Sequence, residues 1–261
     1  MSALNNVLKA FVPNQCLPKA SNYTLIGWWV LLLAVFWTLS PFKLLPTAPE
    51  VVSSMAVEWQ QGVARDLLNS LFISLESIAW AMALGFGLCY LSTIPFFKAP
   101  VEAIGKLRFL STSGILLIFF LATPNGHALK VAVLTFSILV YLLSDMLRVI
   151  DDIPQARFDY ARTMGLNHWQ VLREVVIRAT LADGIESLRG AGAMGWMMLT
   201  MVEGLSRDST GIGLDLQNLA RSNSLAAIFG IQVVILLVGM GQDALLKGLK
   251  TTVCPYTNLK K

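Results

Sequence analysis

Among the charged residues that lie within long apolar stretches of the sequence, four are candidates for a functional role: Glu76, Glu186, Arg189 and Glu203. Charged side chains at membrane depth are costly, and they usually face a protein interior or a water-filled path. Glu186 and Arg189 are three residues apart, so a helix places them on one face, where they either pair with each other or contact a solute. Arg189 and Glu203 are 14 residues apart. In a helix, Glu203 would therefore lie about 21 Å further along the axis and within about 40° of the face of Arg189. This spacing predicts a polar stripe along one membrane helix.

Each candidate for a translocation path also has a structural alternative. Glu203 either lines the path or caps the loop that follows its helix. Trp196, on the same stretch, either faces a cavity or contacts lipid. Glu76 is flanked by Ser74 and Ser77, and the alternative is that it pairs within a helix bundle. For Glu186 and Arg189 the mutual ion pair is the simpler interpretation.

The composition is that of an integral membrane protein. Of 261 residues, 55% are hydrophobic and only 14% are charged, and the mean hydropathy is +0.63. Soluble domains average about 25% charged residues. Three scattered cysteines and two distant histidines predict neither a disulfide framework nor a metal site. The sequence contains no basic cluster with interleaved aromatic residues, which is the pattern that predicts binding to nucleic acid.

Six stretches approach the length of about 20 apolar residues that a helix needs to cross a membrane. They predict an all-α, polytopic helical bundle. The expected spans are residues 22–40, 70–92, 107–123, 129–147, 184–203 and 225–246. The third and fifth carry Ser, Gly and charges, which is typical of helices that line a protein interior. We therefore expect an N-terminal segment 1–21, a transmembrane domain 22–247 and a C-terminal tail 248–261.

The distribution of Lys and Arg predicts the orientation of the spans. With the N-terminus inside, 14 of the 20 basic residues fall in inside segments and five in outside segments, while Arg189 lies within the fifth span. Basic residues accumulate on the cytoplasmic side of membrane proteins. Both termini are therefore expected in the cytoplasm.

A polar segment, residues 154–176, lies in the longest expected cytoplasmic loop, between the fourth and fifth spans. Pro154 suits the start of a helix, where its missing N–H costs nothing. Gly165 suits the left-handed residue that ends a helix, and Asn167 with Gln170 is similar to a capping box that restarts one. The segment predicts a short helix, a glycine turn and a second helix that leads into the fifth span.

One face of this segment is apolar. Its residues recur at steps of three and four, namely Phe158, Ala161, Gly165, Trp169, Leu172 and Val176. Such a stripe is typical of an amphipathic helix. The helix either docks on a partner protein or rests on the membrane surface. Since Trp169 belongs to the stripe, packing is its simplest role, although it is also a candidate for contact with a partner.

The segment resembles the EAA loop of ABC-importer membrane subunits, the binding-protein-dependent permease family. Asp159-Tyr160-Ala161, Gly165, Val175 and Ile177 stand where the family pattern has Glu-Ala-Ala, Gly, Ile and Leu. The likeness to the nitrate, sulfonate, taurine and bicarbonate branch extends over most of the chain. It is carried by residues 44–52, 161–176, 187–204 and 209–220.

The resemblance implies that the loop is a coupling helix seated in a groove of a cytoplasmic ATPase. Asp159, Ala161, Gly165 and Trp169 would then contact the ATPase. Asp159 would pair with a basic group or a helix N-terminus, and the small Ala161 and Gly165 would allow close approach. The sequence contains no GxxxxGK[ST] phosphate loop. We therefore expect no enzyme activity and no cofactor in this chain, with ATP and Mg²⁺ bound by the partner ATPase.

The resemblance also implies an assembly in the bacterial inner membrane. The expected partners are two ATPase subunits, a second permease copy or a paralogue, an extracytoplasmic solute-binding protein and the lipid bilayer. The expected solute is a small anion such as nitrate, a sulfonate, taurine or bicarbonate. Three alternatives stay open: a diverged half of a heterodimeric importer, an ion-gradient-driven secondary transporter, and a membrane scaffold that transports nothing.

The sequence departs from the family pattern at three places. Arg178 replaces the proline that ends the motif, Asp183 lies near a second usual proline, and residues 111–114 lack a proline that is common there. Prolines kink helices. Their loss predicts straighter helices at these positions.

Overall fold

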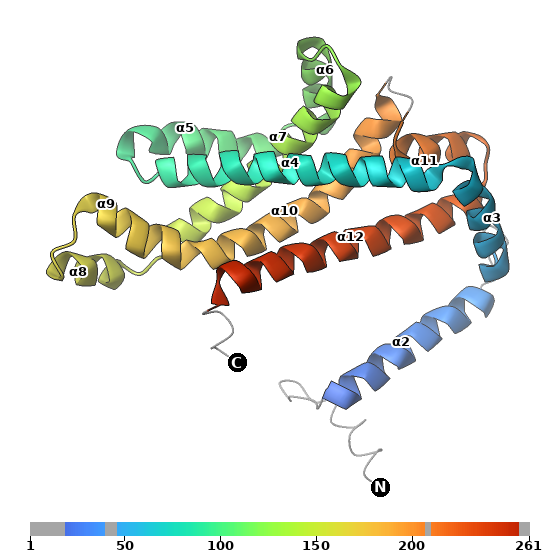
Figure 1. The fold of residues 1–261 in the computed structure, drawn as a ribbon, viewed down its shortest axis with the longest axis horizontal. Coiled ribbons are helices and arrows are strands. Elements are labelled where there is room, and N and C mark those ends of the chain that lie inside the picture. The colour runs from blue at the N-terminus through green and yellow to red at the C-terminus, as the bar shows by residue number, and fades with distance from the viewer. Residues whose placement is uncertain (1–18, 40–45, 207–209, 256–261) are drawn as a thin grey trace, which may run out of the picture.

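The computed structural model describes residues 19–39, 46–206 and 210–255 (Figure 1). These residues form helices and no strand, so the expected all-α fold is confirmed. In chain order the elements are α2 (Lys19–Leu39), α3 (Ala48–Gln61), α4 (Val63–Leu91), α5 (Pro95–Lys106), the 3₁₀-helix η1 (Leu107–Phe109), α6 (Thr112–Ala122), α7 (Gly126–Asp151), α8 (Gln155–Thr163), α9 (His168–Val171), the π-helix η2 (Leu172–Ile177), α10 (Arg178–Leu205), α11 (Ile212–Arg221) and α12 (Leu225–Val253).

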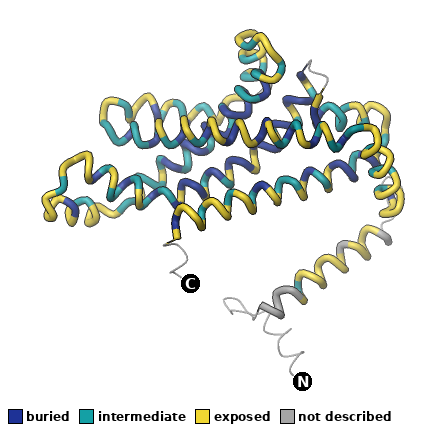
Figure 2. Tube along the Cα trace, in the orientation of Figure 1, coloured by how far each residue is buried: buried dark blue, intermediate teal, exposed yellow. Residues whose placement is uncertain are grey.

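Helices α4, α7 and α10 form the centre of the molecule, and α7 packs most extensively against the other two. Figure 2 shows buried residues concentrated on these helices. Leu142 of α7 and Leu188 and Leu199 of α10 are fully buried. A Cβ on Gly85 of α4 would lie 2.5 Å from Leu142 Cδ2, so the absence of a side chain lets α4 and α7 approach. Because lipid is as apolar as Leu, close van der Waals contact of this kind stabilises a membrane bundle.

The structure contains several helices able to cross a membrane. Three helices are long and apolar enough to cross a membrane, namely α4, α7 and α12. The bent pair α5–α6 is a fourth membrane span if its two helices are counted as one. The described apolar part of α2 is shorter, Thr24–Trp37. Helix α10 has 28 residues, about 42 Å at 1.5 Å per residue, but it is less apolar because it carries charges along its length. A polytopic helical membrane protein is confirmed, and α10 is its polar long helix.

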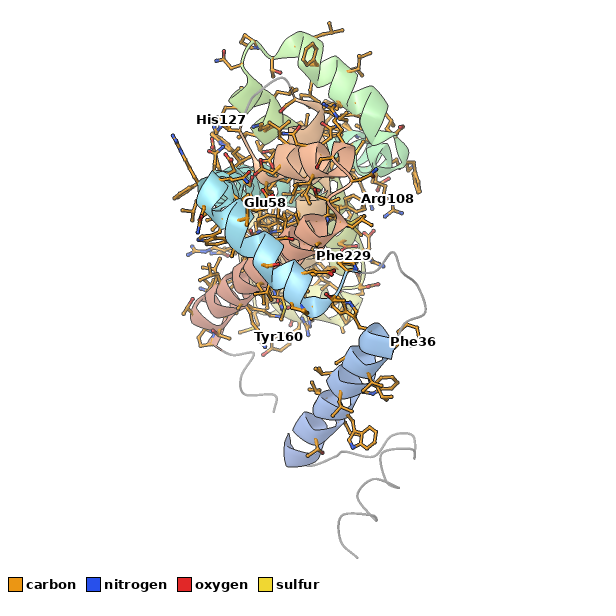
Figure 3. The ribbon with its side chains drawn as sticks, turned by 90° about the vertical axis from the view of Figure 1, so that its right-hand side faces the viewer. Phe36, Glu58, Arg108, His127, Tyr160 and Phe229 are labelled. Atoms are coloured by element: carbon orange, nitrogen blue, oxygen red, sulfur yellow. The ribbon has the colours of Figure 1, made fainter. Side chains whose placement is uncertain are left out.

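Helix α2 stands away from the bundle and connects to it through α3 (Figures 1 and 3). The ring of Trp37 lies 6.2 Å from that of Phe229 in α12, and Trp37 Nε1 donates a hydrogen bond to the Pro46 carbonyl at 2.9 Å. Trp28 and Trp29 are about two-thirds exposed. A helix that is apolar on all sides is suited to lipid or to contact with other membrane helices.

The third expected span, residues 107–123, is not one helix. Leu110 and Ser111 are extended, with ψ of 142° and 128°, and they separate η1 from α6. The segments Pro95–Phe109 and Gly114–Ala122 meet at a bend of 115°. Ser and Thr compete for backbone hydrogen bonds and Gly is flexible, so the sequence at 111–114 favours a helix boundary. The expected straightening at this missing proline was therefore wrong.

Candidate functional site

The loop between α7 and α10 has the predicted helix–turn–helix form. Pro154 is the extended residue before α8, and Gly165 after it has a φ of +75°. The Asn167 side chain accepts a hydrogen bond from the Gln170 backbone N–H, and the Gln170 side chain accepts one from the Asn167 N–H at 2.9 Å. This reciprocal pair is a capping box, so the predicted restart of the helix at Asn167 is confirmed.

The second helix of the loop continues into the fifth expected span without interruption. Residues Leu172–Ile177 form a π-helical turn, and the Arg178 N–H donates to the Arg173 carbonyl, five residues earlier. Helix α10 then runs through Asp183, with no break at either position where the family has proline. Short π-helical turns occur frequently at functional sites. The loop is thus joined to α10 by continuous helix.

Exposed apolar side chains lie at the tip of this loop. Tyr160, Met164 and Trp169 are 67%, 64% and 68% exposed. Packing within the loop was the simplest expectation for Trp169, and that expectation was wrong. A groove of about 500 Å³ lies between α8 and the second helix, and it is lined by residues that include Tyr160, Ala161 and Val175. The loop therefore presents an apolar, grooved surface.

The other predicted loop residues differ in their surroundings. Ala161 is only 3% exposed, so its small side chain packs within the loop. No atom lies within 4 Å of a Cβ placed on Gly165, so this residue borders open space. Asp159 lies 3.5 Å from Arg162 on the exposed surface. An exposed pair of this kind contributes at most about 1 kcal/mol, which leaves the Asp159 carboxylate accessible.

A network of four charged residues links α10 to α12. Arg189 Nη1 donates to both Glu186 carboxylate oxygens at 2.8 and 2.9 Å, so the expected Glu186–Arg189 ion pair is confirmed. Arg189 also makes a bidentate contact with Asp243, with Nε and Nη2 donating at 2.8 and 2.6 Å. Lys250 donates to Glu186 at 2.9 Å. Sequence reasoning missed Asp243 and Lys250, because spacing along one helix carries no signal for a partner on another.

A groove of about 630 Å³ separates α10 from α12, and Arg189 and Trp196 lie on it. Its polar lining also includes Gln232, Gln242 and Asp243. Trp196 Nε1 donates to Gln242 Oε1 at 3.0 Å. Only 7% of Trp196 is exposed, so this side chain borders the groove and does not lie against lipid. Among the candidates for the path, the structure brings Arg189 and Trp196 together at this groove.

Glu76 belongs to a different surface. Its carboxylate lies 3.2 Å from His127 Nε2, and both residues line a groove of about 490 Å³ between α4 and α7. Figure 3 labels His127 near the start of α7. Glu76 thus has a partner on a neighbouring helix, but the pair lies on the exposed surface and not inside the bundle, since the side chains of Glu76 and His127 are 45% and 59% exposed.

Glu203 does not extend the path expected from Arg189. It is fully buried, and it is not among the residues that line the α10–α12 groove. Its carboxylate accepts hydrogen bonds from Ser70 at 2.6 Å and from the Gly213 N–H at 3.0 Å. The prediction of a continuous polar stripe from Arg189 to Glu203 was therefore wrong. The alternative, that Glu203 caps the following segment, is confirmed.

One carboxyl group outside the spans has perturbed electrostatics. Burial raises the pKa of Asp215 in α11 to about 6, and the nearby carboxylates of Asp66 and Glu58 add to the shift. Its Oδ2 atom is buried and has no hydrogen-bond partner. The ionised carboxylate of Asp215 therefore lowers the stability of this conformation at neutral pH.

Comparison with known proteins agrees with this architecture. No protein-family model matches the sequence. The taurine transport system permease protein TauC of Escherichia coli (strain K12) is 24% identical over 250 residues, which cover 87% of this chain and 89% of that protein. The chain is a polytopic helical membrane protein that is similar to a transport permease. More particularly, the resemblance to ABC-importer permeases of the sulfonate and taurine branch is confirmed.

Proposed function

We propose that this permease forms the translocation pathway of an ABC importer and receives force from cytoplasmic ATPase subunits through residues 154–176. The observation that carries the proposal is the loop itself. It leaves Tyr160, Met164 and Trp169 exposed, and a contiguous exposed apolar surface of this kind marks a site of interaction with a partner. The same loop continues as unbroken helix into α10, so a displacement of its tip reaches the polar helix directly.

The resemblance to ABC-importer permeases supports the rest of the assembly. Two ATPase subunits, with ATP and Mg²⁺, bind the loops of two permease subunits, either two copies of this chain or this chain and a paralogue. The loop and the C-terminal end of α12 lie at one end of the bundle, while α3 and α11 lie at the other (Figure 1). With both termini in the cytoplasm of the bacterial cell, the α11 end faces the solute-binding protein.

The network between α10 and α12 carries the movement further. Arg189 contacts Asp243 through two hydrogen bonds, and Lys250 of α12 contacts Glu186 of α10. Charge-assisted bidentate contacts are the strongest hydrogen bonds in proteins. Rotation of α10 by the loop therefore displaces α12 as well, and this changes the groove that both helices line.

The charges at the groove favour a solute that carries both signs. Arg189, Lys247 and Asp243 line it together. A solute with an anionic and a cationic group can separate Arg189 from Asp243 and pair with each of them. A simple anion such as nitrate or bicarbonate can pair with Arg189 but offers no group of opposite charge to Asp243. We therefore propose a small zwitterionic sulfonate, the class of solute named for TauC.

Co-purification and uptake test the proposal. The permease is co-expressed with candidate ATPase and solute-binding-protein subunits of its organism, and the recovered complex is assayed in proteoliposomes for ATP-dependent uptake of labelled taurine and nitrate. Trp169→Asp should reduce ATPase recovery at least tenfold, whereas His168→Ala, an exposed neighbour, should leave it unchanged. Uptake that proceeds without ATP, driven by an ion gradient, would establish a secondary transporter instead.

A further inference from the structure

A buried polar cluster lies at the α11 end of the bundle. We define the α11 cluster as Ser70, Lys130, Glu203 and the turn 210–213. Ser70, Lys130 and Glu203 come from α4, α7 and α10, and each of them is 0% exposed. Buried polar and charged groups are tolerated only when they are hydrogen-bonded or paired. The contacts of this cluster therefore show what it is built to hold.

The cluster holds the N-terminus of α11. Glu203 Oε2 accepts from the Gly213 N–H at 3.0 Å, and Ser70 Oγ accepts from the Ile212 N–H at 3.1 Å. Ser70 in turn donates to Glu203 Oε1 at 2.6 Å. The first N–H groups of a helix lack partners within the helix, and the helix dipole favours a negative charge there. Glu203 is thus the cap of α11, supplied by another helix, and Ser70 connects this cap to α4.

The turn before α11 fits closely around the cap. Lys130 Nζ donates to the Thr210 carbonyl at 2.6 Å, which fastens the turn to α7. Gly211 has a φ of +133°, and a Cβ at this position would lie 2.5 Å from the Glu203 carboxyl carbon. A Cβ on Gly213 would lie 2.2 Å from the Thr200 carbonyl oxygen. Neither position has space for a side chain, so the turn has one conformation over Glu203.

We propose that Glu203 and Ser70 are positioning residues for transport. They fix α11 over the ends of α4 and α10, and so they set the surface that receives solute from the binding protein. Neither residue contacts the solute. The inference rests on the proposed function, since it takes the α11 end to be the face opposite the ATPase loop. Loss of either residue changes the docking of the binding protein and leaves the ATP-driven step intact.

The first test separates docking from turnover. The complete complex, reconstituted in nanodiscs, is titrated with taurine-loaded binding protein while ATP hydrolysis is measured. Ser70→Ala and Glu203→Gln should raise the KM for the binding protein at least tenfold and change kcat less than twofold. Gly190→Ala, where a Cβ meets no atom within 4 Å, is the matched control. An unchanged KM in both cluster variants overturns the inference.

A cross-link distinguishes positioning from direct contact with solute. Asn69 Nδ2 lies 3.4 Å from Thr210 Oγ1, so the Asn69→Cys and Thr210→Cys pair is placed to join α4 to the turn. Oxidation should restore a normal KM to Ser70→Ala and to Glu203→Ala, and dithiothreitol should reverse the rescue. A cross-linked Glu203→Ala complex that stays impaired would show that the carboxylate acts on the solute. A wild-type complex without solute-stimulated hydrolysis refutes the proposed function itself, whereas normal variants in an active complex refute only this inference.

Discussion

Gly165 could be required either for the left-handed turn of the loop or for the close approach of an ATPase, and substitutions distinguish these two roles. Its φ of +75° lies in the left-handed region, where a residue with a Cβ costs about 1–2 kcal/mol and Asn costs less. Since no atom lies within 4 Å of its Cβ position, a new side chain meets no obstacle inside this chain. The backbone cost alone therefore limits the effect of Gly165→Ala to about 5- to 30-fold on the equilibrium that forms the turn, at 1.4 kcal/mol per tenfold.

If an ATPase approaches Gly165 closely, bulk matters more than backbone strain. Gly165→Asn keeps the turn but adds a side chain, and we expect it to lose more ATPase contact than Gly165→Ala. Gly165→Trp should abolish it, with membrane insertion intact. The assays are ATPase recovered per permease and ATP-dependent uptake in proteoliposomes. Thr163→Asn, two residues earlier on the exposed surface, is the control. If Gly165→Asn recovers as much ATPase as the wild type and supports the same uptake, an ATPase does not dock closely at Gly165. The glycine would then be required only for the turn.

Three further outcomes follow from the geometry. Arg189→Ala and Asp243→Ala should each reduce uptake more than tenfold, and the double variant should be no worse than either single one; additive losses in uptake would contradict a shared role. Because the raised pKa of Asp215, about 6, makes its ionised form unfavourable in the fold, melting temperature in detergent should fall as pH rises from about 4 to about 6. Asp215→Asn should remove this fall and stabilise the protein at pH 7 by about 1 kcal/mol. A shift of two pKa units corresponds to roughly 2.7 kcal/mol, which solvent screening reduces. An unchanged dependence of the melting temperature on pH would refute the raised pKa of Asp215. Arg178→Pro should cost only about 1–2 kcal/mol, since it removes one backbone hydrogen bond at the wide π-helical turn and the exposed ion pair with Glu174, whereas Ile185→Pro inside α10 should cost at least about 3 kcal/mol. Equal losses in thermal stability would show that the turn does not accommodate proline.

Local signals in the sequence were sufficient for the loop. Gly165 and the Asn167–Gln170 capping box act over a few residues, so the helix, the turn and the restart were predicted correctly. The Glu186–Arg189 pair was also predictable, because two residues three apart on a helix must be neighbours.

Contacts between helices could not be predicted in this way. Asp243 pairs with a residue 54 positions away, and Ser70 with one 133 positions away. Glu203 was expected on the face of Arg189, because the short helix that it caps was not expected. The break at 110–111 was missed because the apolar residues on both sides of it reach the length of a membrane span.

The π-helical turn at Leu172–Ile177 also affects how faces are counted along this chain. An α-helix rotates by 100° per residue, but a turn closed between residues five apart contains about one residue more. A helical wheel drawn from Trp169 to Arg189 as one regular helix is consequently out of phase by up to about 100°. Comparisons that infer which residues of related transporters share a side should start their count after Ile177.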